Sequence, residues 1–158
     1  LHFEDPETFV QKICELIQTY QVDTSRLTFE ITESTYVNNT AAVNRVIRGL
    51  KQHNIQISMD DFGSGYSSLN ALKDLLFNEV KIDRKFLGDD LTENARIVLQ
   101  EVFHMLKRMG KSIVCEGVET EEIAEFLKAE GCDEIQGFLY YRPMCEEDFE
   151  KLLQTPAV

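Results

Sequence analysis

Two kinds of hydrophobic pattern alternate along the chain. In several segments apolar residues recur at helical spacing, which predicts amphipathic helices. Their expected inward faces are Phe9, Ile13, Leu16, Ile17 and Tyr20; Val43, Val46, Ile47 and Leu50; Leu69, Leu72 and Leu75; Val98, Val102, Met105, Leu106 and Met109; Ile123, Phe126 and Leu127; and Phe149, Leu152 and Leu153. Asp5 and Thr120 are suited to capping the starts of two of these helices, and Gly110 and Gly131 to ending two of them.

Between these helices, apolar and polar residues alternate with a period of two, which predicts β-strands. The strands are expected at residues 27–31, 56–60, 79–82, 112–116 and 134–138. Because helices of this length separate them, the strands must run parallel. The sequence therefore predicts an α/β protein.

Two folds have this order of elements, an open doubly wound sheet and a (β/α) barrel of the TIM type. Strands of an open parallel sheet are apolar on both faces, because helices cover both. Here one face of the strands is apolar, as with Ile57 and Met59, whereas the other becomes polar toward the strand end, as with Asp60. A barrel places such polar residues at the rim where barrel enzymes have their active sites, so we predict a barrel.

A complete barrel needs eight strands and usually about 250 residues, whereas this chain has 158 residues and we identify five strands. The chain also begins with Leu1 rather than Met. We therefore expect residues 1–158 to be a partial domain whose first strands lie upstream, or an open part-barrel. In either case the first and last strands would expose edges that can pair with another chain.

The charge of the chain narrows the range of partners. The sequence has 16 Lys and Arg against 28 Asp and Glu, a net charge of −12, which disfavours nucleic acid and anionic membranes as partners. No apolar run approaches the roughly 20 residues of a membrane span, and no signal peptide is recognisable. The four cysteines lack the spacing of a disulfide framework or a zinc site, so we expect buried free thiols in a reducing cytosol.

The candidate chemistry begins with Asp60 and Asp61, which end a predicted strand and enter a glycine-rich segment. A turn that starts at Asp61 would bring the two carboxylates together, and a divalent cation between them would relieve their repulsion. The alternative is an ordinary Asp-Asp turn in which Asp61 caps the next helix.

Further acids stand at neighbouring strand ends. Glu30 and Glu116 are expected to face the barrel interior, whereas Glu33 and Glu119 come just beyond their strands. Glu33 could brace a neighbouring loop instead of binding metal. For each of these acids, the alternative is a surface residue in an ordinary loop.

Lys81 alternates with Val80 and Ile82, so its ammonium is expected to point into the barrel, where it needs carboxylate partners. A structural lysine that only neutralises these acids is one alternative. A Schiff-base lysine is another, which we disfavour because surrounding acids raise the pKa of the amine instead of lowering it. Gln136 faces inward as well and can hydrogen-bond a water or a phosphate oxygen.

Together these positions form a set of carboxylates, one amine and one amide at five strand ends. Oxygen ligands without His or thiolate suit Mg²⁺ or Mn²⁺ better than Zn²⁺. Two such ions, roughly 3.5–4 Å apart, commonly serve phosphoryl chemistry.

At these residues the sequence resembles the EAL-domain family of cyclic-di-GMP-specific phosphodiesterases. The matching blocks are FEITES (29–34), MDDFGSGYSSL (59–69), VKIDRKF (80–86), CEGVET (115–120) and QGFLYYRP (136–143). They follow the family's order along nearly the whole chain. The resemblance implies a (β/α) barrel that binds cyclic di-GMP and opens one phosphodiester to give linear pGpG, using two Mg²⁺ or Mn²⁺ ions.

The resemblance also implies roles for single residues. The metal ligands would be Glu30, Asp60, Asp61 and Glu116. Lys81 would orient the attacking water, Glu116 would help to deprotonate it, and Gln136 would complete the hydrogen bonds of the site. Glu33 and Glu119 would support loops, residues 62–68 would couple metal binding to a homodimer contact, and Arg142 with Pro143 would contact the substrate.

The Glu-Ala-Leu motif that names the family and a metal-binding Asn are expected upstream of Leu1 and are absent from the chain. We therefore expect an active, cytoplasmic phosphodiesterase in the parent protein and an inactive isolated fragment. The alternative is a non-catalytic module that binds cyclic di-GMP or a partner protein. The retained Asp60, Asp61, Lys81 and Glu116 favour the enzyme, because a scaffold has no need of them.

Overall fold

The computed structural model describes residues 5–64, 76–87 and 91–154, so the helix expected around residues 69–75 lies outside the described part. Its centre is a parallel five-stranded sheet in which the strands follow one another in sequence order. The strands are β1 (Thr28–Thr32), β2 (Gln56–Phe62), β3 (Glu79–Ile82), β4 (Ser112–Cys115) and β5 (Glu134–Ile135). The predicted α/β fold with a parallel sheet is confirmed.

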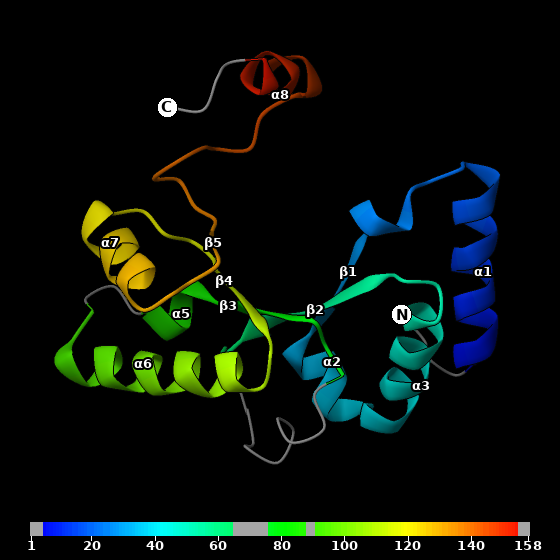
Figure 1. Cartoon of the computed structure of the whole chain (residues 1–158), viewed down its shortest axis with the longest axis horizontal. Coiled ribbons are helices and arrows are strands. Elements are labelled where there is room, and N and C mark those ends of the chain that lie inside the picture. The colour runs from blue at the N-terminus through cyan, green and yellow to red at the C-terminus, as the bar shows by residue number, and fades with distance from the viewer. Residues whose placement is uncertain (1–4, 65–75, 88–90, 155–158) are drawn as a thin grey trace.

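The helices alternate with these strands along the chain, and in Figure 1 all of the labelled helices except α8 lie along the outside of the curved sheet. They are α1 (Pro6–Thr19), the 3-10 helix η1 (Thr24–Arg26), α2 (Glu33–Asn38), α3 (Thr40–Lys51), α5 (Arg84–Leu87), α6 (Glu93–Arg108), α7 (Glu121–Ala129) and α8 (Glu146–Leu153). Asp5 accepts a hydrogen bond from the Thr8 N–H, and Thr120 from the Ile123 N–H, so both predicted caps are confirmed. Of the helices described, none has both the length and the apolar character that crossing a membrane requires.

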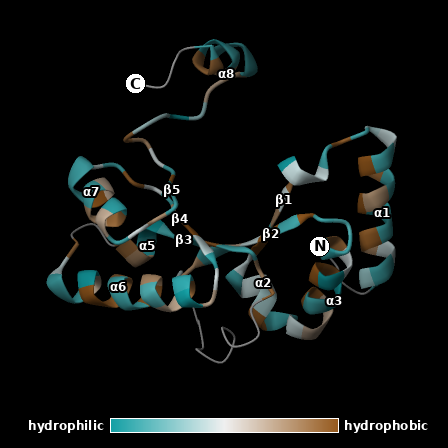
Figure 2. Ribbon diagram, viewed as in Figure 1, coloured by the Kyte–Doolittle hydropathy of each residue, from teal (hydrophilic) through white to brown (hydrophobic). Residues whose placement is uncertain are grey.

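The hydrophobic core lies between the sheet and the helices. The apolar strand residues Ile57, Met59, Val80, Ile82 and Ile113 are almost completely buried. The helical core residues are Val43, Val46, Ile47 and Leu50 of α3, Leu99, Phe103 and Leu106 of α6, and Ala124 and Leu127 of α7. Figure 2 shows apolar and polar residues on opposite sides of α3 and α6. The apolar faces that the sequence periodicity predicts for these helices and strands are therefore buried in the structure.

Helix α1 buries a narrower face than the sequence predicts. Leu16 and Tyr20 are 54% and 73% exposed, so their assignment to the inward face is wrong. The helix packs mainly against α3. A helix in such an outer position contacts the core with fewer residues. Those that pack against the core are Phe9, Val10, Ile13 and Ile17.

The inward face of α6 agrees with the prediction except at one residue: Leu106 is buried, and Val102, Met105 and Met109 pack against the core. Val98 is 50% exposed, whereas its neighbour Leu99 is completely buried. Leu99, Phe103 and Leu106 form a stripe at positions i, i+4 and i+7. Val98 precedes Leu99 by one residue, which is a rotation of about 100° around the helix axis, so its side chain lies outside this stripe.

Helix α8 has no buried residue. Phe149 and Leu153, which the sequence places on an inward face, are 50% and 69% exposed. In Figure 1 the helix stands apart from the sheet at the end of a long connection from β5. Its amphipathic pattern is real, but its apolar side has no partner among the described residues.

The last strand is shorter than predicted, because the chain turns at Gly137. The N–H of Gln136 still bonds to the Cys115 carbonyl at 2.8 Å. At Gly137, however, the backbone packs closely against that of Val118. A Cβ added to residue 137 would lie 2.0 Å from the Val118 carbonyl oxygen. Strand β4 likewise ends one residue early, at Cys115.

The four cysteines are all free thiols. Only Cys115 is buried, whereas Cys14 and Cys132 are partly exposed and Cys145 is exposed. The expectation of free thiols is confirmed, and the expectation of buried ones is wrong for the other three.

Candidate metal centre

Charged side chains gather where the first four strands end. Glu30 lies on β1, Asp60 and Asp61 on β2, and Lys81 on β3, while Glu116 directly follows β4. Because parallel strands in sequence order present their carboxyl ends at one edge, these residues become neighbours although 86 positions separate the first from the last.

Lys81 is the centre of this group. Its Nζ lies 2.6 Å from Glu116 Oε1, 2.7 Å from Glu30 Oε1 and 3.4 Å from Asp60 Oδ1. Its side chain is only 10% exposed, whereas that of Glu30 is half exposed. Three carboxylates from three different segments thus converge on one buried ammonium.

These carboxylates keep Lys81 charged. Burial alone would lower the pKa of the amine, but hydrogen bonds to Glu116 and Glu30 and the charge of Asp60 outweigh burial and raise the pKa above its ordinary value. A Schiff-base role would require a neutral amine, so this environment argues against it.

The backbone at Asp61 differs from the prediction. The strand does not end in a turn there: β2 continues to Phe62, and its register with β3 is interrupted by a bulge between Met59 and Phe62. Asp61 has a φ of 57°, in the left-handed region that Asp tolerates better than most residues. The bulge reorients one residue of the strand, which brings neighbouring carboxylates to the same side.

Asp60, Asp61 and Glu116 form an acidic triad. One carboxylate oxygen from each lies within 4.8 Å of the others, and all three residues are partly buried. Within the described residues, Asp60 Oδ1 is buried without a hydrogen-bond donor, although Lys81 lies at ion-pair distance. A hard divalent cation is the ligand that such oxygen atoms suit. Glu30 lies outside the triad and joins it through Lys81.

The pKa of Asp61 is raised above its ordinary value. Burial contributes most, followed by the negative charge of Asp60 and a hydrogen bond with Asp83. Uncompensated negative charge at the triad therefore favours a bound proton or a bound cation.

Glu33 supports the segment that follows β2. It begins α2, is 4% exposed, and its Oε2 accepts a hydrogen bond of 2.8 Å from the Gly63 N–H. Gly63 has a φ of 89°, and the Phe86 ring packs so closely that no Cβ could be added there. Residues 65–68 of the glycine-rich segment lie outside the described part, so the expected coupling to a dimer contact is not visible.

Glu119 occupies the loop after β4. Its Oε1 pairs with Arg84 Nη1, and Arg84 also packs against Gly117. The ion pair links the start of α5 to the loop after β4.

The remaining predicted site residues follow β5. Gln136 is exposed and is held only through its backbone, because its carbonyl accepts a hydrogen bond from Val118. The Arg142 guanidinium stacks on the Phe138 ring at 4.4 Å, and Pro143 is exposed. In the described part of the chain, none of these side chains forms a hydrogen bond or an ion pair with the acidic group at the ends of β1 to β4.

Sequence reasoning overlooked Asp83 and Arg84. Asp83 follows β3, helps to raise the pKa of Asp61, and accepts a hydrogen bond from the Lys85 N–H at 2.6 Å. Its position immediately after a strand, two residues from Lys81, was the available signal, since polar residues at the other strand ends were considered on that ground.

Comparison with known proteins gives one consistent result. A family model described as the EAL domain matches residues 1–143. A cyclic di-GMP phosphodiesterase of Pseudomonas aeruginosa, PA2567, is 34% identical over 151 residues, which are 95% of this chain and 26% of that protein. The chain therefore spans about a quarter of the length of this relative.

Two solved structures of EAL-type proteins resemble this chain in fold as well as in sequence. The PaMucR phosphodiesterase in its c-di-GMP complex superposes with a TM-score of 0.82 at 36% identity, covering 93% of this chain and 60% of that one. The EAL domain of Mycobacterium smegmatis DcpA gives a TM-score of 0.86 at 31% identity, covering 96% and 69%. These matches confirm the predicted TIM-type barrel fold, of which the five-stranded sheet is a part.

Proposed function

The chain belongs to the EAL-domain family, and from this we propose that the protein containing it hydrolyses cyclic di-GMP to linear pGpG. The observation that carries the proposal is the convergence of Asp60, Asp61 and Glu116 on one point beside Lys81. The names of PA2567 and of the PaMucR complex support the choice of substrate.

We propose that Asp60, Asp61 and Glu116, together with Glu30, hold Mg²⁺ or Mn²⁺. The Asp60 oxygen that accepts no hydrogen bond among the described residues and the all-oxygen donor set fit such a cation. When bound, divalent ions supply an activated water and stabilise the leaving oxygen of a phosphodiester.

Lys81 has two tasks in this proposal. Its ammonium holds Glu30, Asp60 and Glu116 at fixed positions, and its charge offsets that of the incoming phosphate. Because its pKa is raised, it remains protonated and orients a water molecule as a hydrogen-bond donor instead of accepting the proton. Glu116, which is partly exposed, is the group suited to receive the proton of that water.

Other residues position the machinery. Glu33 fixes the backbone at Gly63, and Glu119 fixes the loop after β4 to the start of α5 through Arg84. Gln136, Arg142 and Pro143 lie on the exposed segment after β5, where we propose that they contact the substrate.

We also propose that the protein containing this chain forms a homodimer and acts in the cytoplasm. An anionic dinucleotide needs bound cations to approach a chain with a net charge of −12. Four free thiols are in keeping with a reducing compartment.

The test is an assay of pGpG formation by the protein containing this chain, with Mn²⁺. Asp60→Ala and Glu30→Ala should lower turnover about 100-fold or more, whereas Glu122→Ala, which removes an exposed acid paired with Arg96, should leave it unchanged. Full activity in Asp60→Ala and Glu30→Ala would refute the site. Tight binding of cyclic di-GMP without any turnover in the unchanged protein would instead identify a binding module.

A further inference from the structure

Helices α1 and α3, which lie side by side in Figure 1, enclose a cavity of about 550 Å³ that we call the α1–α3 groove. In α3 it is lined by Arg45, Arg48, Gly49 and Gln52, which recur at positions i, i+3, i+4 and i+7 and so share one side of the helix. The core residues of α3 form a different stripe. The volume lies in the range of roughly 300–1,000 Å³ that is typical of small-molecule sites.

The floor of the α1–α3 groove is apolar. Pro6 of α1 is buried there, and Val10 and Cys14 are partly buried. On the other side, a Cβ added to Gly49 would lie only 2.9 Å from Val10 Cγ2, so the two helices approach closely because residue 49 has no side chain. Water on this floor can be displaced by the apolar part of a ligand, with a gain in free energy.

The rim of the groove is basic. Arg45 and Arg48 are exposed, and within residues 5–64, 76–87 and 91–154 neither side chain forms an ion pair, a hydrogen bond or a ring contact. Four other arginines have such partners, namely Arg26, Arg84, Arg96 and Arg142. Among the described residues that line the groove, Glu7 is the one acid. On a chain with a net charge of −12, two adjacent cations without acidic partners form a local site of positive potential.

We propose that the α1–α3 groove binds a small organic anion with an apolar body, that is, a hydrocarbon chain or ring that carries a carboxylate or phosphate group. The apolar body lies on the floor of the groove, and the anionic group accepts hydrogen bonds from Arg45 and Arg48. A guanidinium presents its N–H donors in one plane, which matches the oxygen atoms of a carboxylate or a phosphate. Gln52 and His53 also line the groove and can add hydrogen bonds.

This site is separate from the candidate metal centre. The lining of the groove includes none of Glu30, Asp60, Asp61 and Glu116. Binding at Arg45 therefore requires neither a metal ion nor cyclic di-GMP, and the proposal does not depend on the proposed function.

The first experiment measures the binding of two probes, octanoate and octyl phosphate, by isothermal titration calorimetry in EDTA without cyclic di-GMP. Arg45→Gln/Arg48→Gln should weaken binding about tenfold or more, because charge-assisted hydrogen bonds are lost. The matched control is Arg26→Gln/Arg108→Gln, which removes the same charge from exposed positions outside the groove and should leave the affinity unchanged. Thermal unfolding of both variants confirms that they fold.

Two comparisons define the ligand class in the same experiment. Octan-1-ol has the same apolar chain without a charge and should bind more weakly than either anion. Tighter binding of octanoate would support a carboxylate ligand, and tighter binding of octyl phosphate a phosphate ligand. The proposal is overturned if neither anion binds, if the alcohol binds equally well, or if the two double variants have the same affinity.

The second experiment locates the bound probe through two free thiols. Cys14 lines the groove, whereas Cys145 lies at the start of α8, beside other exposed apolar side chains. The rate of N-ethylmaleimide modification at each thiol is followed by peptide mass mapping. A saturating concentration of the tighter probe should slow the modification of Cys14 several-fold and leave Cys145 unchanged. Protection of Cys145 without Cys14, or of neither thiol, would place the ligand outside the groove and overturn the proposal.

Discussion

Lys81 determines whether the acids at the strand ends can share one site. Glu30, Asp60 and Glu116 all lie within 3.4 Å of its Nζ, and without a cation these carboxylates would repel one another. The half-exposed Glu30 is partly screened by solvent, whereas Asp60 and Glu116 are only 22% and 21% exposed. The ammonium therefore matters most for the two inner acids.

We expect Lys81→Met to lower the free energy of unfolding by about 2 kcal/mol at pH 7 in the absence of metal, less than for a fully buried pair because Glu30 is screened. The folded pKa is raised above the ordinary 10.5, so the stabilising contribution is complete below pH 10.5 and is lost as pH rises through the folded pKa. Urea unfolding in EDTA measures this: between pH 7 and pH 10 the difference between Lys81→Met and the unchanged chain should stay constant.

The corresponding control is Lys85→Met, which removes an exposed ammonium from the adjoining helix α5. It should change stability by no more than about 0.5 kcal/mol. If both variants behave alike, Lys81 does not carry the charge balance of the site.

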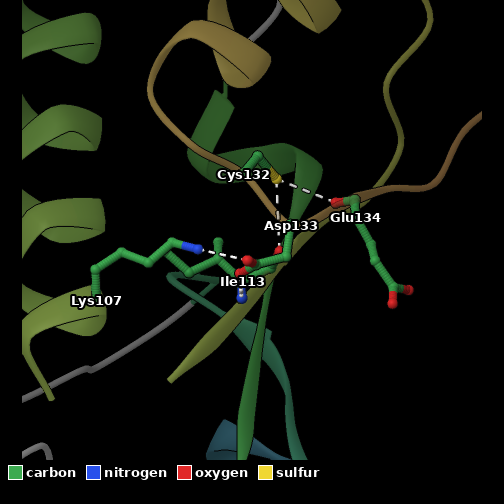
Figure 3. A network of polar contacts seen from close by, with 5 residues as sticks. All are labelled: Lys107, Ile113, Cys132, Asp133 and Glu134. Atoms are coloured by element: carbon green, nitrogen blue, oxygen red, sulfur yellow. Dashed lines mark hydrogen bonds and ion pairs between the residues drawn. The ribbon is translucent and has the colours of Figure 1, made fainter. Parts of the chain in front are cut away.

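Asp133 connects three elements. It lies in the turn before β5 and binds Lys107 of α6 and the backbone N–H of Ile113 in β4, as Figure 3 shows. Burial alone would raise the pKa of this carboxyl, but hydrogen bonds from Lys107 and Ile113 outweigh it and hold the pKa below 3.8. The sheet and its covering helix are thus joined by one charged side chain.

We expect Asp133→Asn to lower the free energy of unfolding by about 0.5–1 kcal/mol at pH 7, a value discounted because the carboxyl is 40% exposed. A depressed folded pKa contributes stability above pH 3.8 that is lost as pH falls through the folded value. The difference between the variant and the unchanged chain should therefore shrink toward pH 2 in denaturant titrations. A difference independent of pH would show that the charge is not responsible.

The end of β5 depends on close contact between two backbones. At Gly137 there is no room for a side chain, because Val118 fills the space. By contrast, a Cβ added to Gly110 at the end of α6 would have no heavy atom within 4 Å. There a side chain would meet only the strain of a positive φ, which is 69°. Comparing alanine substitutions at the two glycines therefore distinguishes the stability lost through a steric clash from the stability lost through backbone strain.

We expect Gly137→Ala to cost about 3 kcal/mol, since the clash is with backbone atoms that cannot rotate away. Gly110→Ala should cost about 1 kcal/mol, from conformational strain alone. Thermal unfolding of the two variants measures the difference. Equal losses would mean that the loop at Val118 moves aside freely.

As a whole, the described part of the chain is an incomplete barrel, because its five-stranded sheet does not close on itself. The outer edge of β1 and that of β5 have no neighbouring strand among the described residues. Beyond β5, large apolar side chains are exposed on the connection and on α8, namely Phe138, Tyr140, Tyr141, Met144, Phe149 and Leu153. Unpaired edges and apolar patches of this kind promote association with another chain.

We predict that this chain forms homodimers at micromolar concentration through this surface. Phe149→Glu/Leu153→Glu should shift the equilibrium to monomer, whereas Val98→Glu, an equally exposed position on α6, should not. Sedimentation velocity over a range of concentrations measures both effects. A monomer at every concentration would contradict the prediction.

Local sequence determined the type and order of the elements, because the periods of helices and strands are local properties. It also singled out Asp60, Asp61, Lys81 and Glu116, since polar residues at the ends of otherwise apolar parallel strands must share one edge. The resemblance at the five sequence blocks identified the family, which the comparisons confirm.

Only the tertiary structure decided how these residues meet. The bulge at Asp61 and the three partners of Lys81 depend on strand register. The exposure of Val98, Phe149 and Leu153 depends on which neighbours a helix finds. An amphipathic pattern reports that a face can be buried, whereas the packing of distant segments determines whether it is.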